Sequence, residues 1–379
     1  MEKKNAALFV FVLIFCFVLL ELSIRIFLPQ TLNIYKYNKD YVFEFRPRAE
    51  LNYVRGEFSQ QIKFNSEGFR DKERDYFSKN ETIYRIAFLG DSFVSALEVS
   101  EENRTSNILE KELNKQFNSS KNIKVKFEVL NLGINGYSTE QELLQLEKKI
   151  INYNPDLIIL NYYIGNDQID NYERKIFEFK EGKLSVNQNR IFSQRWPRSI
   201  FYFLTGKSHL ISLIFNNYQR IISYFNHSAS DIRKEVGAGS GKEFIELSIL
   251  KNETEMSKTI WQKTELLLKN ISSFAEEKDK KFVVIIIPDR IQENEKDLKY
   301  LLSANNFSES DIDIERPQKT LTGFFEKEKI NYLDLLPVLK NKSSEIHYGE
   351  DFHWNEKGHK LVAEKILQKL INESIILIQ

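Results

Sequence analysis

Ser92 is the residue in this sequence that is best placed to act as a nucleophile. It stands in the run Gly90-Asp91-Ser92, directly after an apolar stretch at residues 83–89 that is typical of a buried strand. In an open α/β sheet, ligands and reacting groups gather just beyond the carboxyl ends of the strands. Gly-Asp-Ser is also an ordinary turn sequence, so a catalytic Ser92 requires a base, an orienting acid and oxyanion donors elsewhere in the chain.

His353 is the strongest candidate for the base among five histidines. It lies two residues after Asp351, in a polar loop that follows the last predicted strand. The others are less well placed: His209 and His227 lie in irregular sequence, His347 has only Glu345 as a nearby acid, and His359 lies inside the last predicted helix. In a serine hydrolase, the histidine takes the proton of the serine and the acid fixes the imidazole tautomer. The sequence therefore predicts a Ser92-His353-Asp351 triad.

Three groups at predicted strand ends are candidates to stabilise an oxyanion. They are the backbone amides of Ser92 and Gly136 and the side-chain amide of Asn166. Loss of one such donor commonly lowers the rate by about 10²–10³. Two neighbours of these residues are given structural roles instead: Gly133 is expected to serve the turn before Gly136, and Asp91 to hold the turn around Ser92.

The elements that must position these residues form a regular series. Strands are predicted at residues 83–89, 125–132, 156–162, 281–287 and 330–335, and helices at 101–117, 138–153, 255–278, 317–329 and 356–370. Strands that alternate with helices in this way predict a parallel sheet with right-handed crossovers. Ser138 and Gln141 predict a capping box for the second helix, and Asn355 is expected to cap the last one. No Gly-x-Ser-x-Gly run surrounds Ser92, which argues against the nucleophile elbow of the α/β-hydrolases.

The candidate site residues fall into four blocks that together resemble those of the SGNH (GDSL-type) hydrolases. The blocks are Gly90-Asp91-Ser92-Phe93, the glycine block ending at Gly136, Gly165-Asn166-Asp167 and the Asp351/His353 loop. The resemblance covers roughly residues 83–370 without the segment at about 168–255. It implies a three-layer α/β/α sandwich with a flavodoxin-like parallel sheet.

The last block departs from the family pattern. The family often spaces its final acid and histidine as Asp-x-x-His, whereas here Asp351 stands two residues before His353 and Glu350 stands three before it. We favour Asp351 as the orienting acid and keep Glu350 as the alternative. The Asp-x-His spacing, followed by Trp354 and Asn355, resembles membrane-anchored and glycan O-acetylating branches of the superfamily.

The N-terminus predicts a single transmembrane anchor over residues 1–29. Lys3 and Lys4 precede an unbroken apolar run at residues 6–20, and Glu21 and Arg25 would lie near the far interface. The lysines predict a cytoplasmic N-terminus, which places the rest of the chain outside. The alternative, a cleaved signal peptide, would have a poor cleavage site here.

Two further parts of the chain are predicted after the anchor. Residues 30–80 are expected to form a β-rich apron or linker, with strands near 41–45 and 58–64. For Arg70 in this segment, we favour a structural contact over a contact with substrate. Residues 81–379 are expected to form the hydrolase domain, with an insertion at about 168–255 that caps the site or packs on the membrane face. Within it, residues 237–241 are expected to be a flexible joint.

Composition narrows the function classes. The chain of 379 residues has 54 Lys+Arg and 54 Asp+Glu, and its one cysteine, Cys16, lies in the apolar N-terminus. Equal charges argue against nucleic acid as a partner. A lone cysteine excludes a disulfide framework. No other cluster at metal-ligand spacing accompanies Asp351 and His353, so neither a metal nor another cofactor is predicted.

Three functions remain open. The first is a serine esterase that removes short acyl groups, above all acetyl, from an extracytoplasmic glycan or lipid. The second is a glycan O-acetyltransferase that uses the same triad and a multi-spanning membrane acyltransferase as its partner. The third is a non-catalytic glycan-binding protein of the envelope, against which the complete set of candidate residues argues.

Overall fold

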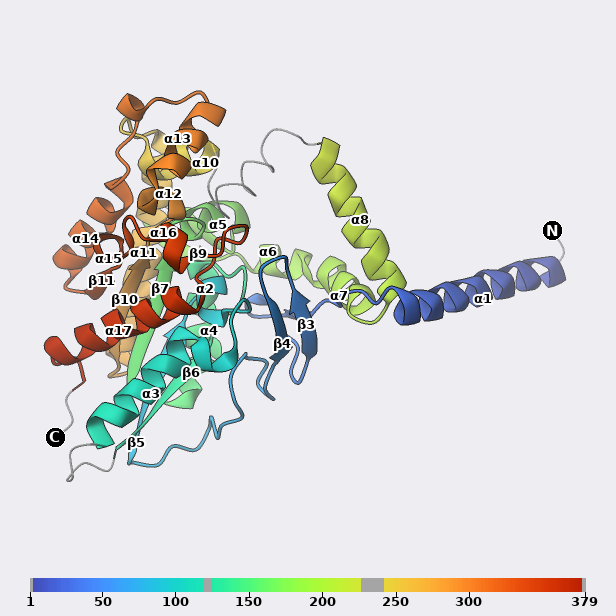
Figure 1. Ribbon diagram of the computed structural model, residues 1–379, viewed down its shortest axis with the longest axis horizontal. Coiled ribbons are helices and arrows are strands. Elements are labelled where there is room, and N and C mark those ends of the chain that lie inside the picture. The colour runs from blue at the N-terminus through green and yellow to red at the C-terminus, as the bar shows by residue number, and fades with distance from the viewer. Residues whose placement is uncertain (1–2, 119–124, 226–241, 377–379) are drawn as a thin grey trace.

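The fold is built around one five-stranded sheet in the order β11-β10-β7-β5-β6. We describe it from a computed structural model that covers residues 3–118, 125–225 and 242–376 (Figure 1). The strands are β5 (Ile83–Leu89), β6 (Lys126–Asn131), β7 (Leu157–Tyr163), β10 (Lys281–Ile287) and β11 (Asn331–Asp334). All neighbouring pairs in the sheet are parallel. Counted along the chain, the order is the flavodoxin-like 2-1-3-4-5 arrangement, so the predicted fold class is confirmed.

Alternate residues of the strands enter two separate hydrophobic cores, one on each face of the sheet. In β5, Ile86 and Phe88 belong to one core, whereas Ala87 and Leu89 belong to the other. Successive side chains of a strand point to opposite faces. The strand is therefore apolar on both sides, as expected for a parallel sheet that helices cover on both faces.

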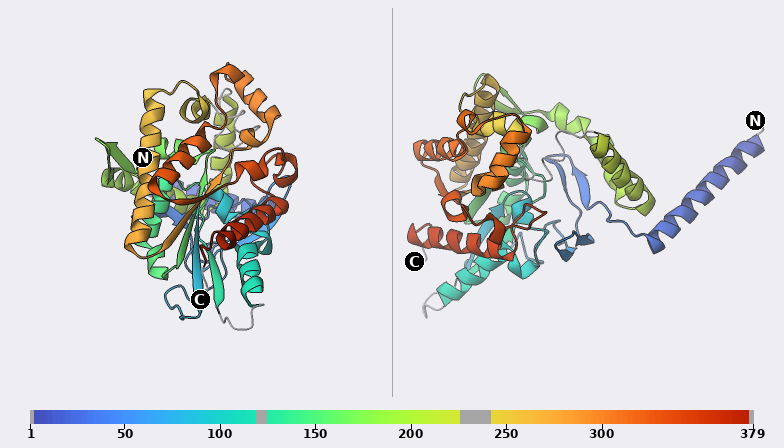
Figure 2. Two further views of the ribbon diagram at one scale, coloured as in Figure 1. Left: turned by 90° about the vertical axis from the view of Figure 1, so that its left-hand side faces the viewer. Right: turned by 45° about the horizontal axis from the view of Figure 1, so that its top comes forward.

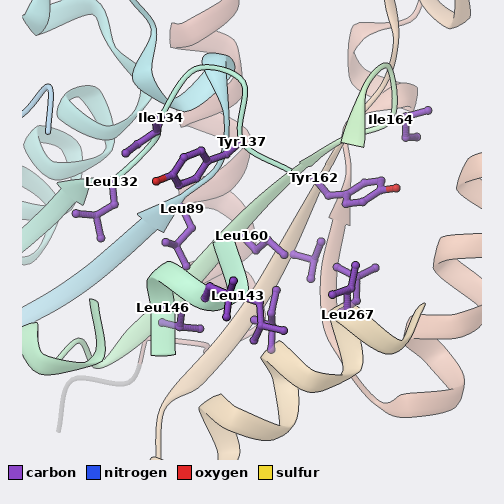
Figure 3. Close-up of a cluster of buried hydrophobic side chains, with 14 of the residues drawn as sticks. Leu89, Leu132, Ile134, Tyr137, Leu143, Leu146, Leu160, Tyr162, Ile164 and Leu267 are labelled. Carbon is purple, nitrogen blue, oxygen red and sulfur yellow. The ribbon is translucent and has the colours of Figure 1, made fainter. Parts of the chain in front are cut away.

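Helices complete the three layers (Figure 2). One core is covered mainly by α4 (Thr139–Lys148), α11 (Glu255–Glu277) and α14 (Arg316–Glu328), the other by α3 (Thr105–Asn118) and α17 (Glu356–Asn372). Figure 3 shows the first core, where Leu89 and Leu160 of the sheet meet Leu143 of α4 and Leu267 of α11. Shorter elements follow the sheet strands: α2 (Ser92–Ser95), η1 (Glu101–Asn103), η2 (Ile150–Tyr153), α12 (Arg290–Glu293), α13 (Glu295–Ala304), η4 (Glu309–Asp311), α15 (Leu336–Leu339) and α16 (Ser343–Ile346).

The helix caps test two local predictions. Asn355 caps α17, because its side chain accepts hydrogen bonds from the amides of Lys357 and Gly358. The predicted capping box at Ser138 and Gln141 is wrong. Ser138 is the N-cap of α4, but its hydroxyl is buried and makes no cap hydrogen bond. The Gln141 side chain donates instead to the carbonyl of Tyr41, 3.1 Å away, so a tertiary contact replaces the local one.

Residues 30–80 carry two antiparallel hairpins, and the two predicted strands, near 41–45 and 58–64, each form one strand of a hairpin. They are β1 (Tyr35–Asn38) with β2 (Val42–Phe45) and β3 (Glu50–Val54) with β4 (Ser59–Lys63). Arg70 is buried and donates to the carbonyls of Ser95 and Val99. The structural role preferred for Arg70 is therefore the one observed.

The N-terminal helix α1 (Lys3–Phe27) extends away from the body of the protein (Figure 1). Its segment Asn5–Phe27 is long and apolar enough to cross a membrane, and 0% of its apolar window is buried. This agrees with either a membrane anchor or a signal sequence.

The region of the predicted insertion holds a series of small elements. They are α5 (Asp167–Arg174), β8 (Phe177–Lys180), β9 (Lys183–Val186), α6 (Gln188–Ser193), α7 (Arg195–Thr205), α8 (His209–Phe225), α10 (Lys242–Phe244) and η3 (Ile245–Ile249). The helices α7 and α8 lie between α1 and the sheet domain (Figure 1). The predicted joint at residues 237–241 lies outside the described residues.

Candidate active site

Ser92 begins the short helix α2 directly after β5. The Asp91 carboxylate caps this helix by accepting a hydrogen bond from the Phe93 amide at 3.0 Å. Gly90 has φ +157°, and a Cβ there would lie 2.5 Å from Val94 Cγ2. The chain can therefore turn out of the strand and place Ser92 at the sheet edge only if residue 90 has no side chain. The structural role predicted for Asp91 is thus the one observed.

His353 contacts Ser92 from the loop between α16 and α17. Its Nε2 lies 2.7 Å from Ser92 Oγ, and its Nδ1 lies 2.6 Å from Asp351 Oδ1. Asp351 Oδ1 also accepts from the His353 backbone amide at 3.1 Å. The Phe93 ring packs against both His353 and Trp354, with centroid separations of 5.1 and 4.7 Å. The structure therefore brings the three predicted residues together, with Asp351 rather than Glu350 on the imidazole.

The loop of His353 is held by the β3–β4 hairpin. The Glu57 carboxylate, at the tip of this hairpin, accepts from the amides of Gly349, Glu350 and Asp351 at 2.6, 2.7 and 3.1 Å. Three amides around one carboxylate fix the backbone directly before His353. Sequence reasoning missed Glu57, because nothing in the pattern of residues 50–63 connects it to a loop almost 300 positions later.

Glu98 is a second carboxylate beside His353 that sequence reasoning missed. Its Oε1 lies 3.5 Å from His353 Nδ1, the nitrogen that Asp351 also contacts. Glu98 is fully buried, and neither of its oxygens has a hydrogen-bond partner among the described residues. No motif marks it, since it stands in an apolar run after α2 and would ordinarily be expected to face solvent.

The carboxylates around His353 set its basicity. Burial alone would lower the pKa of His353, but the negative charges of Glu98, Asp351 and Asp91 outweigh burial and raise the pKa to about 9. Burial would likewise raise the pKa of Asp351, but its hydrogen bond to His353 and the charge of His353 lower it. Burial raises the pKa of Glu98. The site therefore favours a proton on His353, which is the state that follows proton abstraction from a nucleophile.

Asn166 lies at the end of β7, the strand next to β5. Its Nδ2 donates to Asp91 Oδ2 at 3.1 Å, and Ser92 Oγ lies 3.5 Å from the same oxygen. The Asn166 amide is thus held beside Ser92. The strands β5 and β7 flank the point where the strand order reverses, which is where open α/β sheets bind their ligands.

Of the two glycines in the glycine block, Gly133 packs against the helix of Ser92, whereas the nearest atom to a Cβ placed at Gly136 is Arg174 Nη2, 4.0 Å away. Gly136 has φ +78°, a left-handed conformation that favours glycine. Gly133 does not have a positive φ. It allows the backbone to approach α2 closely, because a Cβ there would lie 2.5 Å from the Ser95 amide nitrogen. The Ile134 amide donates to the Gly90 carbonyl at 3.1 Å. This bond joins the glycine block to the Ser92 turn.

The sequence model of the GDSL-like lipase/acylhydrolase family matches residues 86–366, which is most of the chain. The chain belongs to this family. It is therefore an ester-hydrolysing enzyme of the SGNH type, and the predicted family is confirmed. No curated protein matches its sequence.

Several solved structures are similar to this GDSL-like hydrolase over most of its length. TesA is 11% identical, with a TM-score of 0.41 over 76% of this chain and 98% of that one. The lipase/acylhydrolase from Enterococcus faecalis is 12% identical, with a TM-score of 0.40 over 76% and 96%. The acetyl xylan esterase AlAXEase is 14% identical, with a TM-score of 0.39 over 77% and 100%. These similarities are too distant to indicate a substrate.

Three other histidines of this GDSL-like hydrolase serve the fold. His347 Nε2 lies 3.0 Å from Glu293 Oε2, so its acid is Glu293 and not the neighbouring Glu345. His359 is buried, and its Nδ1 lies 2.9 Å from Thr105 Oγ1. His209 Nδ1 accepts from the Gln30 amide at 2.8 Å. His227 lies outside the described residues.

The ligand atoms of Glu98, Asp351 and His353 all lie within 4.8 Å of one another, a spacing that a cation could use. Both imidazole nitrogens of His353 are already engaged, by Asp351 and Ser92. The donor set thus suits proton transfer between Ser92 and His353 better than metal binding.

Proposed function

We propose that Ser92, His353 and Asp351 form a catalytic triad that hydrolyses short acyl esters, above all acetyl esters. The observation that carries the proposal is the continuous path from Ser92 Oγ to His353 Nε2 at 2.7 Å and from His353 Nδ1 to Asp351 Oδ1 at 2.6 Å. A nucleophile bonded to a base, which an acid orients, is the arrangement that activates a serine.

In the first half of the reaction, Ser92 Oγ attacks the acyl carbonyl while its proton passes to His353 Nε2. Asp351 stabilises the resulting imidazolium. The amides of Ser92 and Gly136 and the side chain of Asn166 donate to the oxyanion. The imidazolium then protonates the leaving alkoxide, and the alcohol departs from the acyl-serine.

In the second half, water attacks the acyl-serine and gives a proton to His353. Collapse of the tetrahedral adduct releases the carboxylic acid, and the proton returns from His353 to Ser92 Oγ. If a sugar hydroxyl takes the place of water, the same steps transfer the acyl group and produce an O-acetylated glycan.

The proposed substrate is an acylated glycan or lipid outside the cytoplasm. The Asp351-x-His353 spacing, followed by Trp354, supports it through its resemblance to glycan O-acetylating branches of the superfamily. Lys3 and Lys4 before the apolar span Asn5–Phe27 support an uncleaved anchor with its N-terminus in the cytoplasm.

Contacts of the helix α1 with the rest of the chain support an anchor that is retained. The Glu21 carboxylate accepts from Ser208 Oγ and from the amides of His209 and Leu210 at 2.7, 3.0 and 2.9 Å. It thereby satisfies free amides at the N-terminus of α8. Removal of α1 as a signal peptide would leave these amides without their acceptor.

The triad is tested with the full chain in detergent micelles and an aryl acetate as substrate. Ser92→Ala and His353→Ala are each expected to lower kcat by about 10⁴ or more. Ser303→Ala, an exposed serine on α13, is the matched control and is expected to keep wild-type turnover. Undiminished activity in both site variants, with the fold intact, would exclude the triad. Adding an oligosaccharide acceptor separates hydrolysis from transfer, because transfer yields an acetylated oligosaccharide.

The orientation is tested by protease treatment of spheroplasts and of inverted membrane vesicles. The hydrolase domain is expected to be cleaved in spheroplasts and protected in inverted vesicles. The opposite pattern would place the domain in the cytoplasm and contradict the proposed location.

A further inference from the structure

A cavity of about 950 Å³ lies between the end of α1 and the candidate active site. Its walls come from residues 28–35, the β3–β4 hairpin and the helices α7 and α8. These elements lie together between α1 and the sheet domain (Figure 1). The volume is within the range of sites that bind small ligands.

The inner wall of this cavity adjoins the site. Asn135 and Leu97 line it, and they directly precede Gly136 and Glu98 in the chain. The side chain of Asn135 accepts a hydrogen bond from Ser95 Oγ, in the same short helix as Ser92. A group bound against Asn135 would therefore contact the residue that precedes Gly136, the proposed oxyanion donor, in the chain.

A second part of the inner wall acts electrostatically on the triad. Tyr53 and Arg55 line the cavity, and the Arg55 guanidinium lies over the Tyr53 ring, 5.3 Å from its centroid. The charge of Arg55 favours the ionised form of Asp351 and contributes to the low pKa of that carboxyl. The cavity and the triad thus share one electrostatic environment.

The outer wall of the cavity begins where α1 ends. Leu28 and Pro29 follow α1 directly, and Leu213 and Phe215 of α8 lie on the same wall. The Glu21 carboxylate of α1 binds the amides at the start of α8. If α1 spans a bilayer, Leu28 and Pro29 place this wall of the cavity at the level where the chain leaves the bilayer.

The helices α7 and α8 present apolar side chains that no other part of the described chain covers. On α7, Trp196, Ile200 and Phe203 are 66%, 53% and 65% exposed, and on α8 Ile214 and Tyr218 are 60% and 56% exposed. The spacing of the α7 residues places them on one face of the helix. Exposed apolar faces next to a membrane anchor are typical of helices that lie in the bilayer interface.

The polar residues of the cavity indicate what kind of head group would fit. Asn33, Asn135, Asn216 and Asn217 line it. A carboxamide both donates and accepts hydrogen bonds. Oδ1 of Asn33 and of Asn135 already accepts from Tyr35 and Ser95, and Nδ2 of Asn217 already donates to Leu213. The remaining amide groups suit the hydroxyl groups of a sugar better than an acyl chain alone.

We propose that this cavity binds the acylated sugar head group of a glycolipid whose apolar tail remains in the bilayer. The proposal rests on the function proposed above and specifies its substrate. The tail lies against the exposed apolar faces of α7 and α8, and the head group enters past Asn216. Its acyl group then points past Leu97 and Asn135, the cavity residues next to the site in the chain, towards Ser92. Hydrolysis converts the glycolipid ester and water into the glycolipid alcohol and a carboxylic acid.

The test compares two esters that differ only in their tail. The full chain is reconstituted in phosphatidylcholine vesicles and supplied with hexadecyl 6-O-acetyl-glucoside in the same vesicles or with methyl 6-O-acetyl-glucoside in solution. Val54→Trp and Asn216→Trp place bulk at exposed positions on the cavity wall. Met256→Trp places the same bulk at a position that is 51% exposed on α11, outside the cavity.

We expect the wild type to prefer the hexadecyl ester, and the two cavity variants to lower the ratio of kcat/KM values, hexadecyl over methyl, by about tenfold. Met256→Trp is expected to keep the wild-type ratio. It controls for the higher local concentration of substrate when enzyme and lipid share one membrane surface. Equal use of the two esters by the wild type, or a ratio that neither cavity variant changes, would overturn the glycolipid site. If the wild type hydrolysed neither of the two glucoside esters nor an aryl acetate, the proposed function itself would be contradicted.

Discussion

Glu98 Oε1 lies 3.5 Å from His353 Nδ1, the nitrogen that also lies 2.6 Å from Asp351 Oδ1. Two carboxylates therefore share one imidazole nitrogen. Asp351 is partly exposed and hydrogen-bonded to the ring, whereas Glu98 is fully buried and both its oxygens lack other hydrogen-bond partners in the described chain. A buried carboxylate without hydrogen bonds is costly, and a positive charge on the neighbouring imidazole offsets this cost.

Glu98→Gln is expected to shift the acidic limb of the kcat/KM profile to lower pH by about one unit or more. His353 must be neutral to accept the proton of Ser92, so activity rises with pH up to its pKa of about 9. Removing the negative charge of Glu98 makes the charged imidazole less stable and lowers this pKa. The profile is measured with an aryl acetate between about pH 5 and about pH 10, a range that includes the acidic limb of the wild type and of the variant.

Glu102→Gln serves as the control for this shift. Glu102 is exposed in η1, shortly after Glu98, and its substitution is expected to leave the acidic limb in place. An unchanged limb in Glu98→Gln would show that Glu98 carries its own proton in the working enzyme. Asp351 and Asp91 would then raise the pKa of His353 without it.

Asp351→Asn is expected to lower kcat by about 10²–10⁴, because the imidazole would lose the acceptor that fixes its tautomer. Glu350→Gln is expected to change kcat less than about twofold, since only its backbone amide, bonded to Glu57, takes part in holding the loop. Both variants are assayed at the pH optimum of the wild type. A greater loss in Glu350→Gln than in Asp351→Asn would reverse the assignment of the orienting acid.

The parts of this molecule that follow from short stretches of sequence were predictable. The strand β5 was predictable because residues 86–89 are all apolar, as in a strand that is covered on both faces. All four are buried in the structure. Ser92 directly follows such a strand, and His353 lies in the polar loop before the last helix. Their meeting therefore followed from the parallel topology. Asn355 caps α17 through its own neighbours.

Contacts between distant segments that no motif marks were not predictable. Glu57 and Glu98 reach the His353 loop from a hairpin and from the end of α2, and their roles depend on tertiary packing alone. The same holds for Glu293, which binds His347 in place of the nearer Glu345. At Ser138, the local motif gave the wrong cap because Gln141 is used by a tertiary hydrogen bond to Tyr41.

Asn166→Ala is expected to lower kcat by about 10²–10³ while KM changes little, because an oxyanion donor acts mainly in the transition state. Asn166→Asp keeps the shape of the side chain but replaces the donor with a carboxyl group next to Asp91, and it is expected to lose at least as much. Both are measured under steady-state conditions with an aryl acetate. Wild-type kcat in Asn166→Ala would remove Asn166 from the oxyanion site, and a rise in KM alone would make it a substrate contact.

Gly133→Ala is expected to destabilise the fold by about 1–3 kcal/mol through overpacking. A Cβ at residue 133 would lie 2.5 Å from the Ser95 amide nitrogen and 2.6 Å from Val94. The helix α2 would have to move, and Ser92 with it, so kcat is expected to fall as well. Thermal unfolding of the full chain in detergent and the aryl acetate assay report the two effects separately.

Gly323→Ala is the matched substitution, because Gly323 lies in α14 and a Cβ there would meet nothing within 4 Å. Alanine is favoured over glycine inside a helix by about 1 kcal/mol, so this variant is expected to raise the melting temperature and to leave kcat unchanged. A Gly133→Ala protein that melts and turns over like the wild type would show that α2 can shift without moving Ser92 out of reach of His353. The close contact between the glycine block and α2 would then be a feature of packing that the active site does not need.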